Sequence, residues 1–100
     1  MNTAEYLDAL RAKLDLPSDY ALQKVLGVTK QQVSRYRKGH DVFSDEVALR
    51  VAEFLGRHPG LVMLDMHRER AKTPESKALW QEIFKGFLLL LPRADWGMVR

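Results

Sequence analysis

Apolar residues recur every three to four positions along most of the chain. No stretch alternates apolar with polar residues at the period of two that a half-buried strand requires. The first periodic segment covers residues 3–14. Its inner stripe consists of Leu7, Leu10 and Leu14. Asn2 or Thr3 can cap its start, and Pro17 interrupts the pattern after its end. The spacing predicts an all-α protein that opens with this helix.

A helix-turn-helix motif is predicted at residues 18–39, where two short helices are joined by about three residues. Ser18 can cap the first helix. Gly27 stands where that helix must end in a left-handed backbone conformation, which glycine adopts at least cost. Thr29 can cap the second helix, and Gln32 follows it at the spacing of a capping box. Both sides of the turn therefore carry residues suited to those positions.

The second helix of the motif, residues 29–38, buries little and carries positive charge. Val33 and Tyr36 are its large apolar side chains, so most of its circumference must face solvent. No acidic residue occurs between Asp19 and Asp41. The same segment contains the bases Lys24, Lys30, Arg35, Arg37 and Lys38. The net charge of the whole chain is only +3, but the concentration of positive charge between Asp19 and Asp41 favours a polyanionic partner.

Further helices are predicted after the motif, beginning near Ser44, Pro59 and Pro74. The expected fold is a domain of five to six helices with a C-terminal helical extension. Residues 1–56 form the helix-turn-helix core, residues 57–91 the extension, and residues 92–100 a tail. We expect the extension to pack on the core, and it could also form a dimer.

Composition indicates a folded protein of a reducing compartment. Of the 100 residues, 46% are apolar and none is cysteine, which excludes disulfides and thiolate chemistry. The N-terminal sequence MNTAEYLDAL has acids where a signal peptide needs bases. The longest apolar run, residues 87–91, is far shorter than the roughly 20 residues that span a bilayer. We therefore expect a cytoplasmic protein without membrane contact.

The most specific pattern in the chain is LGVTKQQVSRYRKG at residues 26–39. Residues 18–39 resemble the helix-turn-helix of the Cro and phage-repressor (XRE-like) family. The helix before the motif and the helices after it extend this resemblance to about residue 70. Residues 57–84 look like the extension of small phage-related members. One departure is Gln23, because the family usually has a small residue at this crossing of the two helices. Its side chain must turn outward, or the crossing must open slightly.

The resemblance implies that the cap and first turn of the second helix meet a DNA groove, with the residue one turn later. Arg or Lys can pair with guanine O6 and N7, and Gln with adenine N6 and N7. The expected base-reading residues are Lys30, Gln31, Gln32, Ser34 and Arg35. The expected DNA-backbone contacts, which set register, are Ser18, Lys24, Thr29, Arg37 and Lys38. We expect a sequence-specific transcriptional regulator, acting as a repressor of phage or mobile-element origin.

The apolar side chains of the last helix have two interpretations. They either complete the core or contact a partner, and the residues concerned are Trp80, Phe84, Phe87 and Leu88. Cro-like proteins commonly bind two half-sites as a pair. The run at residues 87–91 is apolar on all sides, which a small monomer would struggle to bury. We therefore expect a homodimer on double-stranded DNA.

Other functions find less support in the sequence. Asp65, His67 and Glu69 point to alternating sides of a helix, and we expect neither a metal site nor a cofactor. With no cysteine nucleophile, glycine-rich phosphate loop or carboxylate pair at a cleft, we expect no enzyme. Two alternatives stay open. One is an interaction module whose last helix docks on another protein, and the other is a phage accessory or excision factor with the same fold.

Overall fold

The computed structural model of the chain describes residues 1–92, and every regular element in that range is helical. The predicted all-α fold is confirmed. The elements in chain order are α1 (Thr3–Leu14), the 3-10 turn η1 (Asp19–Ala21), α2 (Leu22–Leu26), α3 (Lys30–Arg37), α4 (Asp45–Leu55), α5 (Pro59–Arg70) and α6 (Pro74–Leu90). Most of the predicted tail, residues 93–100, lies outside the described residues.

Polar side chains begin most of the helices. The Asn2 side chain accepts a hydrogen bond from the Glu5 N–H, and the Glu5 carboxylate accepts one from the Asn2 N–H. Ser44 and Thr73 accept in the same way from the third residues of α4 and α6. Ser18 differs from the prediction, because its side chain makes no capping hydrogen bond. The chain enters α2 through the 3-10 turn, whose tighter backbone bonds replace a capped first turn.

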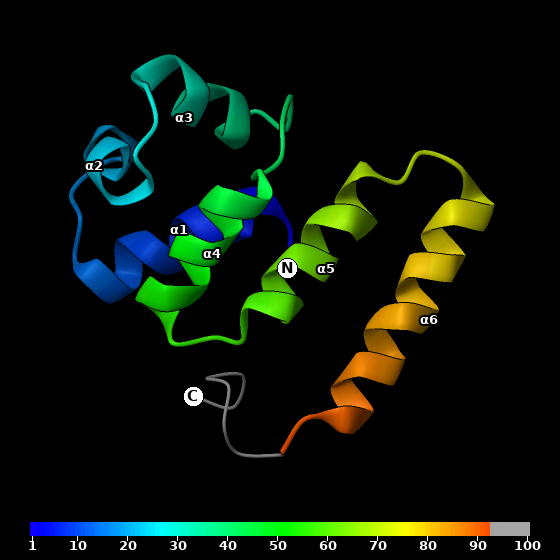
Figure 1. Ribbon diagram of the computed structural model, residues 1–100. Coiled ribbons are helices and arrows are strands. Elements are labelled where there is room, and N and C mark those ends of the chain that lie inside the picture. The colour runs from blue at the N-terminus through cyan, green and yellow to red at the C-terminus, as the bar shows by residue number, and fades with distance from the viewer. Residues whose placement is uncertain (93–100) are drawn as a thin grey trace.

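The centre of the core is formed by α1 and α4, against which α2, α3 and α5 pack (Figure 1). Phe43, in the loop before α4, is fully buried. Its ring meets Tyr36 edge-on with 4.9 Å between centroids, and it lies 6.2 Å from the ring of Tyr6. Within α3, the buried residues are Val33 and Tyr36. The predicted narrow apolar stripe is confirmed; Gln32 and Arg37 are half-buried, and the other residues of α3 are exposed.

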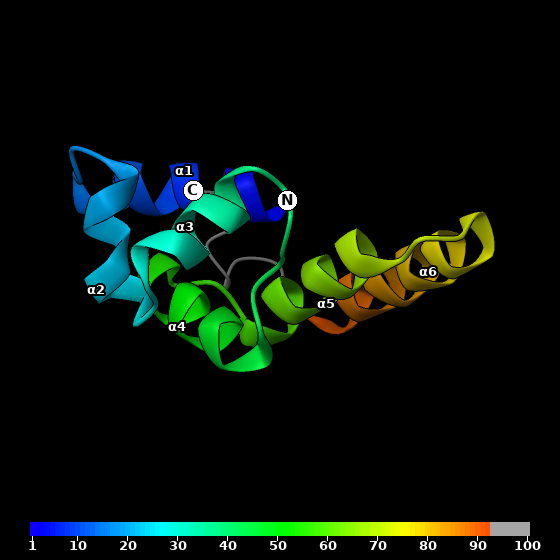
Figure 2. The same ribbon diagram turned by 90° about the horizontal axis from the view of Figure 1, so that it is seen from above.

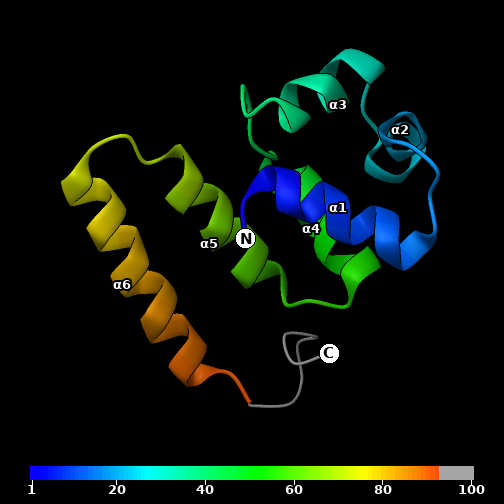
Figure 3. The ribbon, with the colours of Figure 1, turned by 180° about the vertical axis from the view of Figure 1, so that it is seen from behind.

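An antiparallel hairpin of α5 and α6 extends beside this core (Figure 2), and α6 lies on the side of α5 that faces away from α1 and α4 (Figure 3). The Trp80 ring stacks on His67 of α5 with 4.5 Å between centroids. Phe84 is buried, and the guanidinium carbon of Arg68 lies 4.0 Å from its ring centre. The aromatic residues of α6 therefore pack against α5 within the same chain.

The two remaining residues considered for partner contact behave similarly. Phe87 meets His58 edge-on with 5.2 Å between ring centroids, and Leu88 is half-buried. The apolar side chains that α6 leaves exposed are Leu79, Ile83, Leu89 and Leu90. Three of the four residues thus pack against α5 or its cap within one chain, and their contact with a partner stays a prediction. No helix within residues 1–92 is long and apolar enough to cross a membrane.

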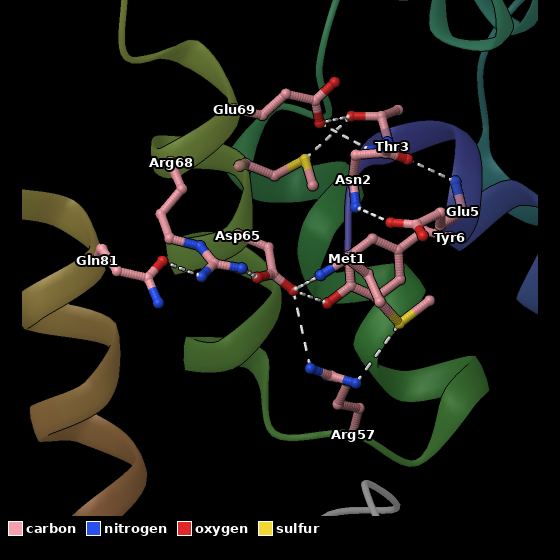
Figure 4. Close-up of polar contacts among 11 residues, drawn as sticks. Met1, Asn2, Thr3, Glu5, Tyr6, Arg57, Asp65, Arg68, Glu69 and Gln81 are labelled. Carbon is pink, nitrogen blue, oxygen red and sulfur yellow. Dashed lines mark hydrogen bonds and ion pairs between the residues drawn. The ribbon is translucent and has the colours of Figure 1, made fainter. Parts of the chain in front are cut away.

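A buried ionic cluster joins α1 to the α5–α6 hairpin (Figure 4). The side chain of Asp65 is fully buried, and its Oδ2 accepts a hydrogen bond from the Tyr6 hydroxyl. Its Oδ1 lies 2.6 Å from Nη2 of Arg68, and the Arg57 guanidinium approaches Oδ2 at 3.7 Å. Burial and the neighbouring carboxylate both raise the pKa of Tyr6, so its hydroxyl stays a donor. One carboxylate thus links two arginines and the core tyrosine.

A second polar contact lies one turn further along α5. The Glu69 carboxylate accepts hydrogen bonds from the Thr3 N–H and hydroxyl, both at 2.7 Å (Figure 4). Asp65 and Glu69 are four residues apart, so they lie on one face of α5 and both meet α1. The hairpin is therefore attached to the core by directional bonds as well as by apolar packing.

Candidate nucleic-acid interface

Two residues define the turn between α2 and α3. Gly27 ends α2 with a φ of 68°, in the left-handed region, and a Cβ there would meet the guanidinium group of Arg50. The Thr29 hydroxyl accepts a hydrogen bond from the Gln32 N–H at 3.1 Å and begins α3. The cap at Thr29 is as predicted, but the Gln32 side chain does not complete a capping box, because its amide binds elsewhere.

Gln23 stands at the crossing of α2 and α3, where the family usually has a small residue. Its amide nitrogen donates to the Tyr20 carbonyl oxygen at 3.2 Å, at the surface. The side chain therefore turns outward, which is one of the two solutions expected from the sequence. The buried side chains between α2 and α3 are instead those of Leu22, Leu26 and Val33.

One face of α3 is polar and exposed. Its residues, together with Lys38 beyond the last turn, are Lys30, Gln31, Ser34, Arg35 and Lys38. At 100° per residue these positions fall within an arc of about 140°, opposite the buried Val33 and Tyr36. Helical geometry thus gathers most of the predicted DNA contacts of α3 on one side. The cap residue Thr29 and Lys24 of α2 are also exposed.

Tyr20 is a candidate that the sequence analysis missed. Its side chain is 66% exposed, and the Lys30 ammonium lies 5.9 Å from its ring centre. Between η1 and α3 there is a hollow of about 220 Å³, lined by Asp19, Tyr20, Lys30, Val33, Ser34 and Arg37. A tyrosine hydroxyl can bind a phosphate beside the groove. The signal in the sequence that could have identified Tyr20 is its position, because it is an aromatic residue outside the apolar stripe of the first helix of the motif.

Gln32 and Arg35 contact the loop between α3 and α4. Nε2 of Gln32 donates to Oδ2 of Asp41 at 3.0 Å. Nε of Arg35 lies 4.0 Å from the same oxygen, and its Nη2 donates to the His40 carbonyl at 3.3 Å. Both predicted base readers are therefore held from the C-terminal side of α3.

Comparison with known proteins assigns this arrangement to a family. Residues 7–62, more than half of the chain, match the helix-turn-helix family. The chain belongs to the Cro/repressor-type helix-turn-helix family. It is similar to "Uncharacterized protein Gp-c" of Pseudoalteromonas phage PM2, with 36% identity over 83 residues, covering 78% of this chain and 89% of that protein. No solved structure matches the chain significantly. The family resemblance inferred from the sequence is confirmed.

The family is one of DNA-binding regulators. In this helix-turn-helix protein, Asp65 and Glu69 turn toward α1 while His67 stacks on Trp80, so the three do not converge. Among the residues that the structure describes, no three His, Asp or Glu side chains are grouped to hold a metal ion.

Arg37 of this helix-turn-helix protein holds α3 to the core. Its Nε and Nη2 donate to the two carboxylate oxygens of Asp19 at 2.8 and 2.9 Å, and its Nη1 donates to Asp8 at 2.8 Å. Arg37 was expected to bind the DNA backbone, and the structure gives its guanidinium partners within the chain instead. We therefore leave it out of the proposed DNA contacts.

The Arg37 hydrogen bonds lower the pKa of the Asp19 carboxyl, with burial acting in the opposite direction. A lowered carboxyl pKa stabilises the folded protein above the ordinary value of 3.8, and this stabilisation is lost as the pH falls below it. Asp19→Asn should lower the free energy of unfolding by about 1–2 kcal/mol at pH 7. In urea titrations at several pH values, this difference should shrink below pH 4.

Asp15→Asn is the matched control, since Asp15 is exposed and has no ion pair within residues 1–92. It should change stability by less than about 0.5 kcal/mol at either pH. An Asp19→Asn deficit that stays constant down to pH 3 would mean that the ion pair with Arg37 does not stabilise the fold.

Proposed function

We propose that the protein is a sequence-specific DNA-binding regulator of transcription that inserts α3 into the major groove. The observation that carries this proposal is the exposed polar face of α3, which contributes nothing to the core. Family membership supports the same function. An α-helix fits the major groove, where each base pair presents a distinct pattern of donors and acceptors.

The proposed roles follow from side-chain chemistry. Guanidinium, ammonium and amide groups pair with the edges of guanine and adenine, and a hydroxyl can serve either base. The proposed base readers are Lys30, Gln31, Gln32, Ser34 and Arg35. Phosphate contacts come from the rim of this face. The residues proposed for them are Ser18, Tyr20, Lys24, Thr29 and Lys38.

Lys38→Ala should weaken binding to all DNA sequences equally, because a phosphate contact carries no sequence information. Removing one such contact should lower the slope of log K against log salt by about one. Fluorescence anisotropy at several salt concentrations measures both effects. Lys85→Ala, on the exposed surface of α6, is the matched control and should leave the slope unchanged. A Lys38→Ala loss confined to one DNA sequence would contradict the phosphate role.

A repressor role, a phage or mobile-element origin and a cytoplasmic location are finer parts of the proposal. The similarity to a phage PM2 protein supports the origin. A homodimer would set two copies of α3 at half-sites about one helical turn of DNA apart. The hairpin of α5 and α6 lies away from α3 (Figure 1). The large apolar side chains that α6 leaves exposed for such a contact are Leu79, Ile83, Leu89 and Leu90.

Selection from a randomised DNA pool at about 0.15 M salt tests the function directly. Enrichment of one sequence with two inverted half-sites supports a dimeric regulator, and a single half-site supports a monomeric one. If no sequence is enriched, and binding is weak and lost with added salt, the base-reading roles are wrong. An excision factor would select a sequence too, but would bend it, which gel mobility of circularly permuted fragments detects.

A protein-interaction module is the second candidate function. It is favoured by the exposure of Leu89 and Leu90, which are 87% and 81% accessible at the end of α6. In that case substitution of these leucines by serine would abolish binding to the partner protein. Selection from the randomised DNA pool would then enrich no sequence.

A further inference from the structure

The loop between α3 and α4 places one carboxylate against the proposed recognition helix. Asp41 is the first acidic residue after Asp19, and its side chain is 46% exposed. Its Oδ1 accepts a hydrogen bond from the Val42 N–H at 3.0 Å, which holds the carboxylate to the backbone of the next residue. Its Oδ2 accepts from Gln32 Nε2 at 3.0 Å and lies 4.0 Å from Nε of Arg35.

Arg35 is held by one of the two edges of its guanidinium group. Nε faces Asp41, and Nη2 donates to the His40 carbonyl at 3.3 Å. Nη1 has no hydrogen bond or ion pair to a residue that the structure describes. Arginine recognises guanine with two parallel N–H groups directed at O6 and N7. Since the loop occupies one edge, the other edge, formed by Nη1 and Nη2, stays available for a base.

We infer that Asp41 is a positioning residue that orients Arg35 and Gln32 for base reading and thereby sets specificity. This inference rests on the function proposed above. Side chains ordered before binding lose less conformational entropy when the complex forms. The carboxylate also repels nearby phosphates, which weakens binding to every sequence. Asp41 therefore lowers general affinity for DNA and raises discrimination at the base that Arg35 contacts.

Asp41→Asn tests this role without disturbing the loop. The amide oxygen can still accept from the Val42 N–H, but the Nδ2 group is a donor and cannot accept from Gln32 or Arg35. Binding is measured on the selected site, on sites substituted at each base pair, and on unrelated DNA. We expect discrimination at one base pair to fall about fivefold to tenfold. Binding to unrelated DNA should strengthen about twofold.

Asp45→Asn is the charge-matched control, since Asp45 is exposed in the first turn of α4 and has no side-chain bond within residues 1–92. It should leave discrimination unchanged. The decisive readout is a double-mutant cycle: in an Arg35→Ala background, Asp41→Asn should have no further effect on discrimination at the base pair that Arg35 contacts. If Asp41→Asn lowers discrimination equally in the wild-type and Arg35→Ala backgrounds, the positioning role is overturned. It is also overturned if the wild type selects a sequence and Asp41→Asn leaves that discrimination unchanged. A wild type that selects no sequence overturns the proposed function, and this inference with it.

Discussion

Asp65→Ala is expected to lower the free energy of unfolding by about 3 kcal/mol, near the lower end of the range for breaking a buried ion pair. The Asp65 side chain is fully buried, and its removal leaves the Arg57 and Arg68 guanidinium groups without their carboxylate. It also leaves the Tyr6 hydroxyl without its acceptor. Since the two arginines are 16% and 24% exposed, water replaces part of the lost interaction. Urea denaturation followed by circular dichroism measures the loss.

Glu53→Ala is the control for this experiment, because Glu53 is exposed on α4 and its side chain makes no bond within the described residues. It should change stability by less than about 0.5 kcal/mol. Asp65→Asn keeps the shape of the side chain and one acceptor oxygen. Its loss of unfolding free energy should therefore fall between those of Asp65→Ala and Glu53→Ala. A loss below about 1 kcal/mol for Asp65→Ala would show that the ionic cluster does not hold the hairpin to the core.

Arg35→Ala is expected to weaken binding to the selected DNA site by about 1–3 kcal/mol and to relax the preference at one base pair. The physical reason is the exposed edge of its guanidinium group, which can pair with guanine O6 and N7. Anisotropy titrations against the selected site and its single-base variants measure the affinity and the preference together. Folding should be unaffected, because Arg35 is 55% exposed and contributes nothing to the core.

Arg35→Lys separates charge from geometry at the same position. Lysine keeps the positive charge but lacks the planar fork of donors. The salt dependence of binding should therefore stay close to that of the wild type, while discrimination falls. Loss of affinity in Arg35→Ala without any change in base preference would assign this residue to the DNA backbone instead.

Most of the helices were predictable because they leave a local signal in the sequence, whereas the start of α2 was not, since Ser18 does not cap it. The caps at Asn2, Thr29 and Ser44 lie directly beside the apolar periods that they begin. The exposed face of α3 was predictable for the same reason, since a helix with only Val33 and Tyr36 to bury cannot be enclosed.

The partners of the polar side chains could not be read in this way. Arg37 was assigned to DNA because it lies in the basic segment between Asp19 and Asp41, yet Asp19 and Asp8 meet it through the packing of α3 on η1 and α1. The Asp65 cluster likewise joins residues almost sixty positions apart. Ionic partners depend on how helices cross, and the apolar period of one helix does not specify that geometry.

Arg68 of α5 contacts both the ionic cluster at α1 and the last helix, α6. It binds Asp65 on the core side, and on the other side it donates to the Gln81 amide oxygen at 2.6 Å and lies over the Phe84 ring. Displacement of α6 would therefore alter the surroundings of Asp65 and its partner Tyr6 in α1. Through these shared contacts we expect α6 and α1 to be thermodynamically coupled. A molecule that binds α6 would also stabilise the helix-turn-helix core. The size of this effect depends on how much more tightly the molecule binds α6 when α6 is packed on α5 than when it is displaced.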